Sequence, residues 1–263
     1  MVERIIKKVV HKIVSTINYK EENEIRKILS NSNKPIYHFH IRKTAGTAIN
    51  FSFLMDGDSN GAQGFYDKLA QKFNHRLVKK DKVFVGWNKS LINKGHYSYA
   101  FSHTPFHQLK LSKNIFKFTC LREPTDRVIS HYNMLMYFKK NKIKHPCMKV
   151  EGKWLGNSFS DFISNIPRKT LLNQLYMFSE KLEVEEAVNN ILSLDLILFT
   201  EDLENGIRSL ENKTKCELVI SKQKNYGHKE EITESEMKNL EILLKDEIRM
   251  FNIIRKNNYN TKM

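Results

Sequence analysis

The sequence predicts an α/β fold in which a mostly parallel sheet is flanked by helices on both faces. Short apolar runs of strand length, rich in Ile, Phe, Tyr and Val, alternate with longer segments of helical periodicity. Strands that alternate with helices favour parallel pairing, and such sheets bind ligands at the carboxyl ends of their strands. Polar and basic residues follow several of the predicted strands, so we expect the functional site at that edge of the sheet.

Five runs are predicted as strands: Ile36 to Ile41, Val83 to Gly86, Tyr97 to Phe101, Ile115 to Leu121 and Leu194 to Thr200. The predicted helices span Ala45 to Met55, Pro124 to Phe138, Phe159 to Ile166, Arg168 to Ser179, Val184 to Leu192 and Thr233 to Ile254. No linker rich in Pro, Gly or Ser interrupts this pattern, so residues 31–263 are predicted to form a single domain.

Residues 1–30 are predicted to form an N-terminal basic amphipathic helical segment. Apolar residues from Ile5 to Val14 recur at helical spacing and lie opposite lysines. Such a helix can make peripheral contact with an anionic membrane, but packing against the domain is its commoner fate. The chain has no apolar run of the roughly 18 residues that a membrane span needs. Its three cysteines include no CxxC pair, and we expect a reducing, cytoplasmic location.

The composition is strongly basic, with 44 Lys and Arg against 29 Asp and Glu and a formal net charge of +15. This charge raises the local concentration of polyanions such as nucleotide phosphates, anionic sugars, nucleic acids and membrane surfaces. A solvated basic surface without a partner explains the charge equally well.

The first candidate phosphate site is a P-loop-like turn between a predicted strand and a predicted helix. It reads Arg42-Lys43-Thr44-Ala45-Gly46-Thr47. Gly46 lets the backbone approach an anion, the free N–H groups of the helix start point at it, and Lys43 adds a positive charge. Thr44 and Thr47 can add hydroxyl donors. The Walker A spacing is absent, because Lys43 precedes the glycine, and a helix cap with an incidental lysine also fits this turn taken alone.

The second candidate site follows the predicted strand Ile115 to Leu121. Arg122 stands at the strand end, and Pro124 opens the next helix. Ser130 lies off the apolar stripe of that helix. An arginine fork and a serine hydroxyl can together hold a phosphate. Arg127 is expected to be a surface or ion-pair residue.

Together the two segments resemble the PAPS-dependent sulfotransferases, where PAPS is 3′-phosphoadenosine 5′-phosphosulfate. The resemblance is to the carbohydrate sulfotransferase branch related to the heparan sulfate 2-O enzymes. The resemblance covers about Ile36 to Tyr132, and a weaker similarity continues to Ile254. Arg42 departs from the pattern, because related enzymes usually have a proline before the lysine.

The resemblance implies the sulfotransferase fold, PAPS as donor, adenosine 3′,5′-bisphosphate as product and no required metal. It assigns the 5′-phosphosulfate to Arg42, Lys43, Thr44, Ala45, Gly46 and Thr47, and the 3′-phosphate to Arg122 and Ser130. Lys224 lies in a basic loop that closes over the nucleotide in the family. Asn173 and Gln174 resemble a pair found near the nucleotide or the acceptor.

The resemblance also implies a catalytic histidine at the end of the predicted strand Tyr97 to Phe101. His103 matches it, although Ser102 replaces the usual glycine. A neutral imidazole suits removal of a hydroxyl proton, while Lys43 stabilises charge on the leaving oxygen. His107 and His96 are the reserve candidates, whereas His38 and His40 on the first strand are expected to be structural.

The implied acceptor is a hydroxyl group of an oligosaccharide or polysaccharide, and no nucleic-acid partner is expected. The acceptor cleft is expected in loops such as Asp56 to Asp81 and Lys139 to Asn157. The second loop contains lysines that suit an anionic sugar, at Lys142, Lys144, Lys149 and Lys153, but a solvent-facing role explains them equally well.

Two other readings remain open. A P-loop kinase is favoured by Glu201 and Asp202, which follow a predicted strand as a Walker B acid does. The displaced lysine and the pairing of Arg122 with Ser130 weigh against it. The net positive charge is the one feature that favours a nucleic-acid-binding protein. The aromatic residues do not favour it, because most of them have core-like patterns instead of forming a basic platform.

Overall fold

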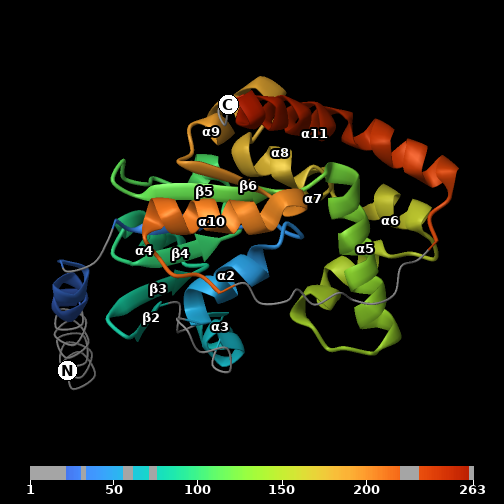
Figure 1. The fold of residues 1–263 in the computed structure, drawn as a ribbon. Helices are drawn as coiled ribbons and strands as arrows, with labels where there is room; N and C mark the ends of the chain where they lie inside the picture. Colours follow the sequence, from blue (N-terminus) through green and yellow to red (C-terminus); the bar gives the residue numbers. More distant parts are fainter. Residues whose placement is uncertain (1–21, 31–33, 56–61, 71–75, 220–230, 261–263) are drawn as a thin grey trace, which may run out of the picture.

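A central sheet organises the computed structural model, which describes residues 22–30, 34–55, 62–70, 76–219 and 231–260. Within these residues six strands lie in the order β2-β3-β4-β1-β5-β6 (Figure 1). Their bounds are β1 (Ile36–Phe39), β2 (Arg76–Lys79), β3 (Lys82–Gly86), β4 (Tyr99–Ser102), β5 (Phe116–Leu121) and β6 (Leu196–Phe199). Only the β2–β3 pairing is antiparallel among these strands, so the predicted mostly parallel sheet is confirmed.

The central strand β1 determines where the site forms. It pairs in parallel with both β4 and β5, and Phe39 lies in register with Ser102 and with Thr119. The segments that follow these three strands therefore leave the sheet at one edge. This arrangement is the physical basis for expecting one site from three distant parts of the sequence.

Helices cover both faces of the sheet, as Figure 1 shows for α2 and α10 on one side and α8, α9 and α11 on the other. One core contains side chains of α2 (Gly46–Met55), α3 (Ala62–Ala70) and α10 (Leu203–Thr214). The other core contains side chains of α4 (Lys89–Lys94), α5 (Pro124–Lys140), α6 (Phe159–Asn165), α7 (Arg168–Leu171), α8 (Asn173–Phe178), α9 (Val184–Leu192) and α11 (Glu234–Asn260). Alternation along β1 sends Tyr37 to the second core and His38 to the face covered by α2.

The predicted helix Arg168 to Ser179 is wrong in one respect, because it is broken into α7 and α8. Leu172 leaves the helical region, with φ −95° and ψ 48°. The break directs Asn173 and Gln174 to the strand ends, where they bond the backbone of Arg42 and Arg122. A helical period cannot reveal such a break, since the apolar residues on both sides keep helical spacing.

Several short elements were not predicted. The edge strand β2 and the helices α3, α4 and α10 have mixed or polar sequences, and β2 is half-buried or exposed throughout. The described part of the chain also contains four 3₁₀ turns: η1 (Phe106–Gln108), η2 (Pro146–Lys149), η3 (Glu151–Trp154) and η4 (Thr200–Asp202).

Residues 1–21 of the predicted N-terminal helical segment and the loop that contains Lys224 lie outside the described residues. Residues 22–30 are helical, and Ile25 is buried in the core with α5 and α11. The division of the chain at residue 30 stays a prediction. Among the described residues, no helix is both long and apolar enough to span a bilayer.

Candidate active site

The turn between β1 and α2 has the backbone shape of an anion-binding loop. Lys43 and Ala45 have positive φ values of 68° and 61°, although neither is glycine, and Thr44 between them does not. Alternating left-handed and right-handed residues aim successive N–H groups into one concavity. Strained residues of this kind persist where the surrounding structure holds them, and they cluster at functional sites.

Gly46 has a packing role in addition to its expected role at the anion, which stays a prediction. A Cβ on this residue would lie 1.9 Å from the His40 ring, so the imidazole occupies the space of the missing side chain. Asn50 on α2 holds that ring, with its Nδ2 3.3 Å from His40 Nδ1. The glycine therefore allows a histidine at the end of β1 to pack against the start of α2.

Lys43 is the central cation of the loop. Its side chain is half-buried, and its Nζ lies 3.4 Å from the sulfur of Met134 on α5. Burial lowers the pKa of Lys43 to about 8, with the positive charge of Arg122 as the next cause. Repulsion between these two cations indicates a site that gains stability when an anion enters.

Arg122 brings the second predicted phosphate site onto the first. Its Nη1 lies 3.4 Å from the backbone oxygen of Lys43. The Arg122 backbone is held on both sides by Gln174, because its N–H donates to Oε1 at 2.9 Å and its carbonyl accepts from Nε2 at 2.9 Å. Ser130 is half-buried in the second turn of α5, and its role as a phosphate ligand stays a prediction.

The two bonds between Gln174 and the Arg122 backbone are called the Gln174 clamp below. A buried carboxylate, which was not predicted from the sequence, supports this clamp. Glu247 on α11 is fully buried and accepts hydrogen bonds from Gln174 Nε2, at 3.3 Å, and from the Leu175 N–H, at 3.0 Å. It also pairs with Arg127 Nε at 3.2 Å. Arg127 is thus an ion-pair residue, as one of its two expected roles states, but it lies in the core and not at the surface. Glu247 could have been found from the sequence, because an acidic residue at a core-facing position of a helix is rare unless it is paired.

His103 has the tautomer that a general base needs. Its Nδ1 donates to the backbone oxygen of His40 at 2.6 Å, because a carbonyl can only accept. The lone pair is therefore on Nε2. Burial lowers the pKa of His103 to about 4, which keeps the ring neutral near pH 7. The His40 ring packs beside it, with ring centroids 4.4 Å apart.

The other histidines occupy different environments. His96 lies before β4, at the opposite end of the strand from His103, and its Nδ1 is 3.3 Å from Glu22. His107 packs against Tyr176, and neither of its buried ring nitrogens has a hydrogen-bond partner among the described residues. His38 is buried and bonded to Asn50 at 2.9 Å, as its expected structural role requires.

Two residues of the phosphate loop have side chains engaged within the protein. The Arg42 guanidinium pairs with Glu151, while its backbone N–H donates to Asn173 Oδ1 at 3.4 Å. The Thr44 hydroxyl is buried and donates to the Ile41 carbonyl at 3.1 Å. The hydroxyl proton of Thr44 and the guanidinium of Arg42 are therefore engaged within the protein.

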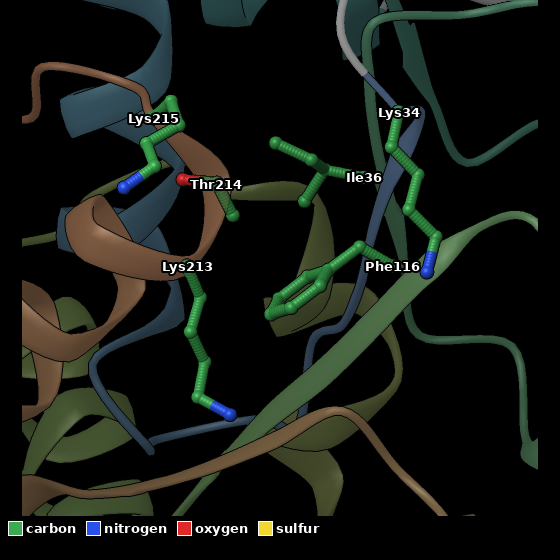
Figure 2. Close-up of a pocket in the computed structure, with 6 residues that line it drawn as sticks. All are labelled: Lys34, Ile36, Phe116, Lys213, Thr214 and Lys215. Carbon is green, nitrogen blue, oxygen red and sulfur yellow. The ribbon is translucent and has the colours of Figure 1, made fainter.

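Two further features lie at the surface: Glu201, the candidate Walker B acid of the kinase alternative, and a hollow. Glu201 accepts a hydrogen bond from the Glu123 N–H at 2.7 Å and so supports the turn before α5. The hollow in Figure 2 is lined by Lys34, Ile36, Phe116, Lys213, Thr214 and Lys215. Ile36 and Phe116 are the first residues of β1 and β5, so this hollow lies at the sheet edge opposite Lys43 and Arg122.

The geometry can be compared with known proteins. No curated protein matches the chain significantly. A family model described as the sulfotransferase family matches residues 26–253, which is most of the chain and includes β1, the phosphate loop, His103 and Arg122. This match, together with the α/β sheet, assigns the protein to an enzyme family that transfers sulfuryl groups. The chain belongs to the sulfotransferase family.

Proposed function

We propose that this protein transfers a sulfuryl group from PAPS to a hydroxyl group of a carbohydrate. The observation that carries the proposal is the contact of Arg122 Nη1 with the Lys43 carbonyl, 3.4 Å away. This contact supports one site formed by two cationic strand ends. The neutral imidazole of His103 follows β4, the other neighbour of β1 in the sheet. Sulfotransferases generally use PAPS as the donor.

The residues present fit a nucleotide with phosphates at both ends of one ribose. The positive-φ loop and Lys43 suit the 5′-phosphosulfate, because N–H groups and an ammonium converge there. Arg122 and Ser130 suit the 3′-phosphate, through a guanidinium fork and a hydroxyl. Bound PAPS supplies the sulfuryl group that is transferred.

Two side chains carry the chemistry. His103 Nε2, with its lone pair free of the Nδ1 bond to His40, accepts the proton of the acceptor hydroxyl. The Lys43 ammonium stabilises negative charge that develops on the leaving 5′-phosphate oxygen. Positioning and charge stabilisation are sufficient for this type of transfer, by analogy with phosphoryl transfer.

A basic surface near the site supports an anionic carbohydrate as acceptor. Residues 139–157 carry exposed lysines at Lys139, Lys140, Lys142, Lys144, Lys149 and Lys153. The one acid of this stretch, Glu151, is buried and paired with Arg42. The field of this surface favours sulfated or carboxylated sugars over neutral alcohols.

Ligand-induced thermal stabilisation tests the donor. Adenosine 3′,5′-bisphosphate without Mg²⁺ is expected to raise the melting temperature in proportion to RT ln(1 + [L]/Kd). ATP with Mg²⁺ is the comparison, and stabilisation by ATP with Mg²⁺ but not by the bisphosphate would favour the kinase reading. Transfer of labelled sulfate from PAPS to a panel of oligosaccharides, lipids and small alcohols then tests the acceptor. Transfer to small alcohols alone would refute the carbohydrate assignment.

A further inference from the structure

A buried carboxylate joins three parts of the chain beside the phosphate loop. Glu151 in η3 is 5% exposed. One of its oxygens pairs with the Arg42 guanidinium, and the other accepts from His131 Nε2 at 2.7 Å. Arg42 belongs to the phosphate loop and His131 to α5. Burial raises the pKa of Glu151, but the hydrogen bonds from His131 and Arg42 outweigh this effect and leave the pKa below its ordinary value.

Glu151 lies in the α5–α6 segment, defined as residues 141–157. The segment contains the short turns η2 and η3 and forms no strand of the described sheet, and it packs against α5 and α6. Trp154 packs edge-on against the His131 ring, with centroids 6.1 Å apart, and Leu155 is buried. A segment with so little regular structure depends on long-range bonds for its position.

The segment lies close to the catalytic cation. The Cys147 thiol and the Glu151 carboxylate both influence the pKa of Lys43. Lys43 and Arg42 in turn influence the pKa of Cys147, a half-buried residue of η2. The same segment presents Lys142, Lys144, Lys149 and Lys153 to solvent. Its position therefore determines how these lysines face the place of sulfuryl transfer.

We propose that Glu151 is a positioning residue that tethers the α5–α6 segment to the phosphate loop through Arg42 and His131, and so forms one wall of the acceptor cleft. The acceptor part of this inference rests on the proposed function, whereas the tether does not. Arg42 is assigned to the tether, which leaves the donor phosphates to the loop backbone, Lys43, Arg122 and Ser130.

Amide hydrogen exchange on the full chain tests the tether without any substrate. Glu151→Gln and Arg42→Gln are each expected to speed exchange in residues 141–157 by about tenfold, with little further increase in the double variant, because both remove one shared interaction. Arg42→Lys keeps the charge and is expected to retain most of the protection. Glu180→Gln, a change at an exposed acid, is the matched control.

Exchange in β5 shows whether a variant has unfolded globally, since that strand is central and buried. If β5 stays protected and Glu151→Gln changes exchange in residues 141–157 by less than about twofold, the tether is refuted. Rates that multiply in the double variant would refute the coupling between Arg42 and Glu151.

Kinetics test the acceptor wall separately. Glu151→Gln is expected to raise the KM for an anionic oligosaccharide by about tenfold, with kcat and stabilisation by adenosine 3′,5′-bisphosphate nearly unchanged, as for a lost binding contact. An unchanged acceptor KM, or a loss confined to bisphosphate binding, would overturn this part. If the wild-type chain neither binds the bisphosphate nor transfers sulfate, the proposed function fails while the exchange result still decides the tether.

Discussion

Replacement of Glu247 by glutamine tests how the site is supported from the core. The carboxylate is fully buried and receives bonds from Arg127, Gln174 and the Leu175 N–H. Glutamine keeps the volume but removes the charge, so the fully buried Arg127 guanidinium loses its counter-ion. Breaking a buried ion pair from one side costs about 3–5 kcal/mol, because a buried charge is left without compensation.

This cost is large compared with the stability of a typical domain, which is about 5–15 kcal/mol. At about 2–4 °C for each kcal/mol, the melting temperature is expected to fall by roughly 10 °C. Urea unfolding and calorimetry measure the effect. Glu241→Gln, at an exposed position of the same helix, is the control and is expected to change stability by less than about 0.5 kcal/mol. Stabilisation by adenosine 3′,5′-bisphosphate is also expected to weaken, because Glu247 orients the Gln174 clamp on Arg122.

The double variant Arg127→Met with Glu247→Gln separates charge from packing. Once both charges are absent, the loss of stability is expected to be smaller than the sum of the two single losses. A Glu247→Gln protein within about 1 kcal/mol of wild type, or additive losses in the double variant, would refute the reasoning.

Three further predictions concern the catalytic base, the pH dependence of the reaction and the pH dependence of folding stability. His103→Ala is expected to lower kcat by about 10²–10⁴ while bisphosphate stabilisation is kept, and His107→Ala serves as its control; unchanged turnover would exclude His103 as the base. Because the pKa of Lys43 is lowered to about 8 and that of His103 to about 4 in the ligand-free protein, kcat/KM for PAPS is expected to be flat near neutral pH and to fall above pH 8, when Lys43 loses its proton. A kcat/KM that rises through pH 8 contradicts this role. Burial also lowers the pKa of His38 to about 3 and that of His40, so below about pH 6.5 the unfolded chain binds protons that the folded chain does not. Stability is therefore expected to fall as pH drops from about 6.5 towards 4, and equal urea midpoints at pH 7 and pH 5 would contradict it.

Much of the fold follows from local patterns in the sequence. Apolar runs and helical periodicity identify five of the six described strands and most long helices, because side-chain burial repeats along each element. The predicted site residues His103 and Arg122 directly follow β4 and β5, and Lys43 lies in the turn after β1. Because those strands pair in parallel, all three residues lie at one edge of the sheet. Short polar elements such as β2 and α3 carry no comparable pattern, so sequence reasoning missed them.

By itself, the sequence determined the α/β class, the turn between β1 and α2, and the order of the cationic residues after the strands, since these depend on neighbouring residues and on the rule of parallel pairing. Only the tertiary structure decided that Arg42 pairs with Glu151, that Glu247 supports the Arg122 turn, and that Gly46 makes room for His40. The pairing of Arg42 with Glu151 and the support of the Arg122 turn by Glu247 each join residues far apart in the chain. These residues lie on elements whose relative placement is set by packing. Local periodicity contains no information about which buried charges meet when those elements pack.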